Sequence, residues 1–244
     1  FCDLKFVDNW FIKVIKDYDV VLVLFGDAIP QELNPDIVCT RPNIAPMLKK
    51  HLLVGDHKTI FVQDYADTAY YWDGEINRDW ECEVGFLSIG DAGQGPLQKL
   101  LMCSSIAKKY KLKVVGPNRI PIPEYLGQIH NENIVSFLKS CKVALDWNAL
   151  NLLNQAANGI FTISTIENSL FPSINPNSVN MDKITSYLSK DKARNTITKK
   201  AQQQILQSDT CYHRLLDIIN QIPDMNKYIQ LTNEKIEEYL CVQE

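Results

Sequence analysis

The sequence of 244 residues has no long hydrophobic run. Its longest apolar segment, Val20–Phe25, has the length of a strand and is much shorter than the roughly 20 apolar residues that a helix needs to cross a bilayer. No signal-peptide pattern opens the chain. We therefore expect no membrane span and predict an intracellular, cytoplasmic protein.

The sequence also has no excess of positive charge. Lysine and arginine number 25 against 29 aspartate and glutamate residues, which gives a net charge of −4 and a pI near 5.6. A protein that binds a phosphate backbone needs a basic surface to replace the counterions. Nucleic acid is therefore not an expected partner.

Cysteine occurs seven times, but without a Cys-x-x-Cys pair, and no group of residues has the spacing of metal ligands. We expect buried, reduced thiols and no bound metal ion or other cofactor. The chain begins at Phe1 and enters an amphipathic segment almost at once. We therefore expect a piece of a longer polypeptide, whose other domains would be partners.

Short apolar segments alternate with segments of helical spacing, a pattern typical of a parallel sheet covered by helices. Seven segments are predicted strands: Val20–Phe25, Asp36–Thr40, Thr59–Gln63, Val84–Ile89, Lys113–Val115, Val143–Asp146 and Ile160–Ser164. A polar stretch with a turn glycine, Asp73–Glu81, separates two series. The predicted fold is α/β, with Rossmann-like domains at residues 1–79 and 80–221; residues 222–244 are expected to join the first.

Apolar residues at helical spacing predict helices over Leu97–Ala107 and from Ile134 to Cys141. The end of the chain is predicted to be all-helical. Ser208 and Asp209 are expected to begin the helix that carries Tyr212, Leu215, Leu216 and Ile219 on one face, and a last short helix is expected over Asn233–Leu240.

A glycine-rich loop, Gly90–Gly95, follows the predicted strand Val84–Ile89 and leads to Pro96, a residue that favours a helix start. Backbone N–H groups of such a loop, together with the positive end of the helix, favour an anion. The spacing is Gly-x-x-Gly-x-Gly and not the dinucleotide fingerprint. A phosphate site and a plain glycine turn are therefore both open.

Three carboxylates follow predicted strands at the end where open α/β sheets bind ligands. Asp27 follows the first strand, and Asp64 and Asp67 follow the third. Each is a candidate general base and equally a candidate turn former or helix cap. Asp64 is preferred because it lies close to several aromatic residues that suit a sugar: Tyr65, Tyr70, Tyr71 and Trp72.

A series of short segments occurs in an order and spacing known from one family: Glu83–Ser88, Tyr125–Ile129, Asn133–Cys141, Val143–Asn148, Leu153–Phe161 and Asp209–Arg214. From Cys82 to about Ile219 the chain resembles the glycosyltransferases of the GT-B fold. It is most similar to the nucleotide-sugar-binding half of the spore-maturation (CgeB-like) group.

This resemblance implies that the second domain binds a nucleoside-diphosphate sugar and the first a carbohydrate acceptor. By position, the donor-binding residues are Gly90, Asp91, Gly93, Gln94, Arg119, Gln128, Ile129, His130, Asp146, Asn148, Asn151 and Asn154. Loop amides would stabilise the leaving diphosphate without a metal ion. If the reaction inverts the anomeric centre, Asp64, or else Asp27 or Asp67, would deprotonate the acceptor hydroxyl.

The sequence departs from the family pattern on one predicted helix, where Asn154 replaces the usual glutamate and Asn151 the usual arginine. An amide forms hydrogen bonds but has no charge, so Arg119 or Lys99 would supply the positive charge. The predicted function is a metal-independent glycosyltransferase, with UDP among the candidate nucleotides, in glycan biosynthesis. A sugar-nucleotide epimerase and a non-catalytic binding module are the alternatives.

Replacement of Gly93 with aspartate should abolish nucleotide binding, because a carboxylate in the predicted loop repels the donor diphosphate. In calorimetric titrations with UDP, GDP, TDP, CMP and ADP we expect one nucleotide to bind, with or without magnesium. If Gly93→Asp binds that nucleotide as tightly as the parent chain, the loop is not the phosphate site.

Overall fold

The computed structural model describes residues 22–24, 37–40, 58–61, 63, 65–67, 74–88, 96–146, 149–175, 180–222 and 226–241. The chain divides into two compact units. The smaller combines Phe1–Asp64 with Tyr212–Glu244, and the larger is Tyr65–Cys211. By this division residues 65–79 belong with the larger unit.

The larger unit is built on a parallel sheet with the strand order β5-β4-β6-β7. Its strands are β4 (Cys82–Leu87), β5 (Leu112–Val115), β6 (Cys141–Asp146) and β7 (Thr162–Ser164). Most residues of these strands are buried, as a parallel sheet with helices on both faces requires.

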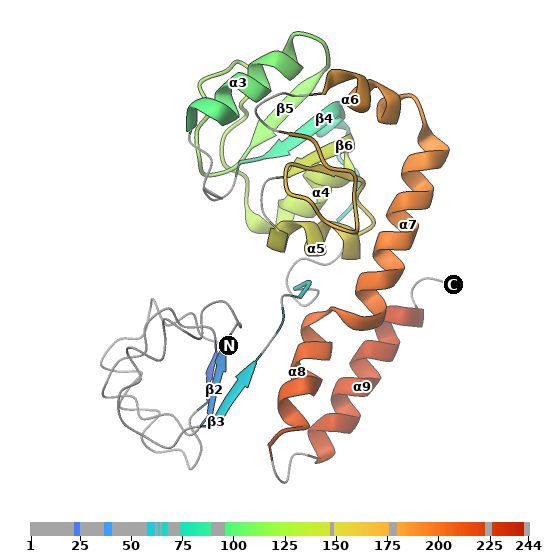
Figure 1. Ribbon diagram of the computed structural model, residues 1–244. Helices are drawn as coiled ribbons and strands as arrows, with labels where there is room; N and C mark the ends of the chain where they lie inside the picture. The colour runs from blue at the N-terminus through green and yellow to red at the C-terminus, as the bar shows by residue number, and fades with distance from the viewer. Residues whose placement is uncertain are drawn as a thin grey trace, which may run out of the picture. The chain divides into compact units, whose positions relative to one another are not determined.

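Helices cover both faces of this sheet (Figure 1), and alternate residues of the strands enter two separate cores, one on each face. On one face, Val84 and Phe86 of β4 pack with Met102 and Ile106 of α3 (Pro96–Ala107), and α6 (Met181–Leu188) closes the same core. On the other face, Leu87 packs with residues of α4 (Ile134–Lys139).

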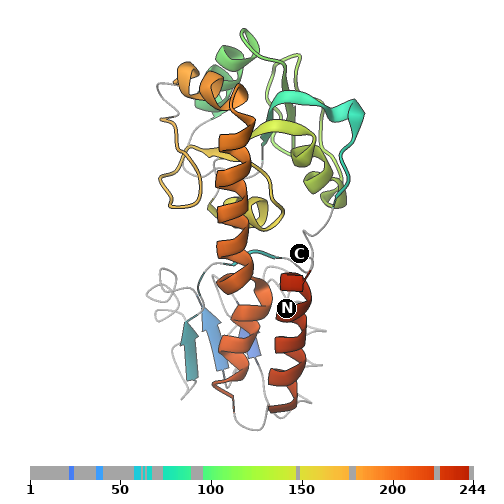
Figure 2. The same ribbon diagram turned by 90° about the vertical axis from the view of Figure 1, so that its right-hand side faces the viewer.

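The same second face carries α5 (Ala149–Ala157), because Thr162 of β7 hydrogen-bonds to Gln155 of this helix. The long helix α7 (Asp191–Ser208) runs past α5 (Figure 2). The two helices pack through a small apolar core that includes Leu152 and Ala156 on α5 and Ala201 and Ile205 on α7. Helix α5 is therefore fixed between the sheet and α7.

Ser208 and Asp209 end α7 and do not begin the next helix, so that prediction is wrong. The reason is a short extended pairing with Ala66, whose N–H donates to the Asp209 carbonyl (2.7 Å) and whose carbonyl accepts from Cys211 N–H (2.8 Å). The chain remains extended at Thr210, and α8 (Cys211–Ile219) begins only afterwards.

The smaller unit contains a second parallel sheet, with β1 (Leu22–Leu24), β2 (Ile37–Thr40) and β3 (Lys58–Phe61) side by side in that order. Each of the seven segments predicted as strands therefore contains or overlaps a strand, and an α/β fold with parallel sheets is confirmed. Helix α8 from Tyr212 onward and α9 (Asn226–Cys241) belong to this unit. The predicted last helix lies within α9.

Two glycines with positive φ form the turn after β5: Gly116 at +133° and Gly127 at +99°. The N–H of Gly116 donates to the carbonyl of Gly127 (3.0 Å). A Cβ on Gly116 would lie 2.5 Å from the carbonyl oxygen of Ser88, whereas a Cβ on Gly127 would have no atom within 4 Å. Gly116 therefore allows the turn to approach the end of β4.

Alanine at Gly116 should destabilise the protein more than alanine at Gly127. Both substitutions impose a positive φ on a residue with a Cβ, at a cost of about 1–2 kcal/mol. Only Gly116→Ala also displaces the Ser88 backbone, which adds about 1–3 kcal/mol. Urea unfolding of the two variants measures the difference, and equal losses would contradict the close approach.

Candidate functional site

The strand order creates a switch point between β4 and β6. From β4 the chain goes to β5 on one side and then crosses to β6 on the other side of β4. The carboxyl ends of β4 and β6 therefore lie on either side of the point where the strand order reverses, and open α/β sheets bind ligands at this edge. The predicted donor residues Gly90, Asp91, Gly93, Gln94 and Asn148 lie outside the described residues.

Ser88 follows β4 at this edge and is fully buried. Its N–H donates to the carbonyl of Val115 (2.7 Å), and its carbonyl accepts from the N–H of Asn118 (3.3 Å). Its hydroxyl oxygen, however, has no hydrogen-bond partner in the structure. A buried hydroxyl without a partner is uncommon and costs about 1–3 kcal/mol, so a polar ligand atom placed beside it would gain a hydrogen bond.

Three buried polar side chains are connected by hydrogen bonds at the carboxyl end of β6. The Nε2 group of Gln155 donates to Oδ2 of Asp146, and the Oε1 atom of Gln155 accepts from the hydroxyl of Thr162. All three residues are at most 2% exposed. Asp146 therefore ties the end of β6 to α5, and Gln155 continues the connection to β7.

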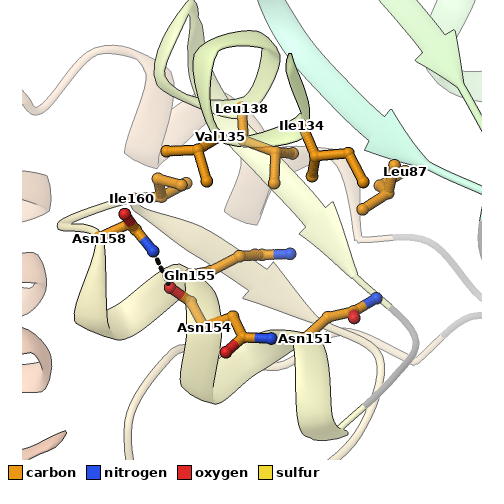
Figure 3. Close-up of a pocket in the computed structure, with 9 residues that line it drawn as sticks. All are labelled: Leu87, Ile134, Val135, Leu138, Asn151, Asn154, Gln155, Asn158 and Ile160. Atoms are coloured by element: carbon orange, nitrogen blue, oxygen red, sulfur yellow. Dashed lines mark hydrogen bonds between the residues drawn. The ribbon is translucent and has the colours of Figure 1, made fainter. Parts of the chain in front are cut away.

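A small pocket lies between α4 and α5, with two unlike walls (Figure 3). Its volume of about 30 Å³ has room for one or two water molecules. The amide Nδ2 of Asn151 is buried without a hydrogen-bond partner. The apolar wall consists of Leu87, Ile134, Val135, Leu138 and Ile160. The opposite wall consists of the amide side chains of Asn151, Asn154, Gln155 and Asn158.

The side chain of Asn154 forms a hydrogen bond within the larger unit. Its Oδ1 atom accepts from the backbone N–H of Asp67 (2.6 Å), and its carbonyl accepts from Nδ2 of Asn158 (2.8 Å; Figure 3). The structure thereby brings Asp67, one of the predicted catalytic carboxylates, to the helix that carries Asn151 and Asn154. The other two candidates, Asp27 and Asp64, lie outside the described residues.

The remaining predicted donor residues, Gln128, Ile129, His130 and Arg119, lie in the segment after β5. Gln128, Ile129 and His130 come directly after Gly127. The carbonyl of Gly127 accepts from the N–H of Gly116, the residue after β5, so these three residues lie near the carboxyl edge of the sheet. Ile129 packs against the core around Leu87, while the other three are exposed. Lys99, the alternative cation, is only 3% exposed on α3.

Three residues of this region were not predicted: Ser88, Gln155 and Thr162. Ser88 could have been singled out because it directly follows a buried strand, where ligand-binding residues gather. Gln155 and Thr162 had no such signal, because their hydrogen bonds join α5 and β7 only after both elements have packed on the sheet.

Among the residues that the structure describes, no group of three or more histidine, cysteine, aspartate or glutamate side chains is placed to hold a metal ion. Within the same ranges, every helix is too short or too polar to traverse a bilayer.

No protein-family model matches the sequence, and no curated protein is significantly similar to it. Three solved structures share its fold at a TM-score of 0.51. A sucrose-phosphate synthase from Thermosynechococcus elongatus is 11% identical over 96% of this chain and 64% of its own. A glycosyltransferase from Rickettsia africae is 12% identical over 96% and 82% of the two chains.

The third structure is a protein assigned as a UDP-N-acetylglucosamine 2-epimerase from Listeria monocytogenes, 9% identical over 78% of this chain and 71% of its own. At such low identities the likeness shows the fold alone. The shared α/β fold agrees with the GT-B architecture that the resemblance implies. This chain spans less than two thirds of the sucrose-phosphate synthase.

Leucine at Gln155 should destabilise the protein by about 2–4 kcal/mol, because the buried Asp146 carboxylate loses a donor and Thr162 loses an acceptor. Valine at Thr162 retains the shape and leaves the bond from Gln155 to Asp146 in place, but it removes the hydroxyl that donates to Gln155 and, at 3.5 Å, to the Ile160 carbonyl. We therefore expect a smaller loss of about 1 kcal/mol. Urea unfolding measures both.

The matched control is Gln203→Leu on the exposed side of α7, where the same chemical change should alter stability by at most about 0.5 kcal/mol. If Gln155→Leu lowered the free energy of unfolding no more than this control does, the hydrogen bonds of Gln155 with Asp146 and Thr162 would contribute nothing to the packing of α5.

Proposed function

We propose that this chain is a glycosyltransferase that moves a sugar from a nucleoside-diphosphate sugar to a carbohydrate acceptor without a metal ion. The observation that carries the proposal is the switch point of a GT-B-type fold, with hydrogen-bonding groups left unpaired beside it. These are the hydroxyl of Ser88 and the amide Nδ2 of Asn151. Two of the structures with this fold are a sucrose-phosphate synthase and a glycosyltransferase.

The described part of the site offers neutral hydrogen bonds. Ser88 and Asn151 each have a hydrogen to donate to a phosphate oxygen or a ribose hydroxyl. Most of the diphosphate charge would be met by the backbone amides of the predicted loop Gly90–Gly95. The exposed Arg119, with Gln128 and His130 after β5, would complete the nucleotide contacts from the same edge.

The acceptor would bind on the side of residues 1–79, in a two-domain arrangement of the GT-B type. Asp64 is the preferred base, and Asp67 is the alternative whose backbone N–H is bonded to Asn154. Such a carboxylate would take the proton of the acceptor hydroxyl as it attacks the sugar. Membership of the spore-maturation (CgeB-like) group and a cytoplasmic location are parts of the same proposal.

A second candidate is a binding module that has the fold but no turnover. The observation that favours it is the bond from Asp67 N–H to Oδ1 of Asn154 (2.6 Å). The resemblance implies a donor-binding carboxylate at this position. Here a neutral amide stands there, and its oxygen already has a partner within the protein.

Aspartate at Asn151 should weaken binding of the preferred nucleotide about tenfold or more, because it adds a negative charge where the proposal places the diphosphate or the ribose. Gln203→Glu on the exposed side of α7 adds the same charge away from the site and should leave affinity unchanged. Calorimetry measures both affinities, and thermal unfolding confirms that each variant is folded.

The matching nucleotide sugar is then incubated with the chain, with and without a panel of glycan acceptors. Transfer that needs an acceptor and persists in EDTA supports the glycosyltransferase. Conversion of the donor sugar in the absence of acceptor identifies an epimerase, and binding without turnover identifies a module. If no nucleotide binds, the proposed site is refuted.

A further inference from the structure

Two cysteines lie side by side at the amino edge of the larger unit's sheet, opposite the edge with Ser88. Cys82 begins β4 and Cys141 begins β6, and the two residues are partners in the strand register. Their Sγ atoms are 3.3 Å apart. Neighbouring strands are about 4.8 Å apart, which lies within the Cα separation of about 4.4–6.8 Å that a disulfide spans.

Gly85 makes room for this arrangement. A Cβ on residue 85 would lie 2.1 Å from Sγ of Cys141, so any other side chain here would displace the thiol. The Cys141 thiol also donates to the carbonyl of Phe137 in the last turn of α4 (3.1 Å). The sulfur is therefore held over β4 and beside Cys82.

A surface pocket of about 350 Å³ opens onto both cysteines. Cys82 is 6% exposed and Cys141 is half-buried, so a reagent reaches them through this pocket. Lys111, Lys139 and Lys142 also line it, together with Glu81 and Glu83. A small molecule fits in this volume, and the lysines favour a thiolate nearby.

The two thiols differ in acidity. The hydrogen bond between the two thiols, together with the charges of Lys113 and Lys111, lowers the pKa of Cys82 despite its burial. The same hydrogen bond and burial raise the pKa of Cys141. By comparison, burial raises the pKa of Cys103 to about 12. Cys82 is therefore the thiol that ionises first, and Cys103 is inert.

We propose that Cys82 and Cys141 form a reversible disulfide by exchange with a small-molecule disulfide such as oxidised glutathione. The Cys82 thiolate attacks one sulfur of the reagent, which forms a mixed disulfide and releases a thiolate. Cys141 gives its proton to that thiolate and attacks the Cys82 sulfur, which forms the protein disulfide and expels the second thiolate. The second thiolate takes from water the proton that Cys82 lost on ionisation, so two protein thiols are oxidised and one external disulfide is reduced to two thiols.

The test equilibrates the full chain in glutathione buffers from fully reduced to fully oxidised, quenches with acid, alkylates the free thiols and maps the peptides. We expect a Cys82–Cys141 cross-linked peptide that increases with oxidised glutathione and disappears with dithiothreitol. The melting temperature should rise by about 5–10 °C in the oxidised sample, because the bond closes a long loop. No such peptide under oxidising conditions would overturn the proposal.

Two variants separate the steps. Cys141→Ser should stop at a mixed disulfide of glutathione with Cys82, while Cys103→Ser should form the cross-link as the parent chain does. If Cys141→Ser instead leaves Cys82 unmodified, Cys82 is not the attacking thiol. The mapping of the parent chain needs no variant and no nucleotide, so its result is independent of the proposed transferase activity.

Discussion

The fold depends on one constraint: the parallel sheet of the larger unit must be buried on both faces. Its strands carry no polar face, because alternate residues such as Phe86 and Leu87 enter different cores. Side chains that can bind a ligand or react can therefore gather only where the central strands begin or end. In this chain the carboxyl edge carries Ser88 and Asp146, and the amino edge carries the cysteine pair.

The position of α5 at the carboxyl edge depends on buried hydrogen bonds as well as apolar packing. Gln155 joins this helix to Asp146 and Thr162, while Leu152 and Ala156 pack it against α7. Partly satisfied polar groups in such an interior are costly, so the helix has one strongly preferred register on the sheet. This register determines where the amide side chains of α5 lie in the pocket, and it brings Asn154 into contact with the backbone of Asp67.

Local patterns in the sequence were sufficient for the strands and most helices, because apolar runs and helical spacing reflect burial directly. They could not predict pairings that depend on strand order. Asn154 contacts Asp67, 87 residues away, and Cys82 meets Cys141 only because β6 lies beside β4. Ser88 is similar, since its unpaired hydroxyl is visible only once the neighbouring turn at Gly116 is in place.

The two asparagines of α5 are best understood together. The resemblance implies an arginine and a glutamate at these positions. A charged side chain beside the apolar wall of Leu87 and Ile134 is costly unless a partner or a ligand compensates it. Replacing both with amides leaves the pocket neutral. The described lining of the pocket therefore offers neutral hydrogen-bonding groups and no charge, while Arg119 is exposed in the segment after β5.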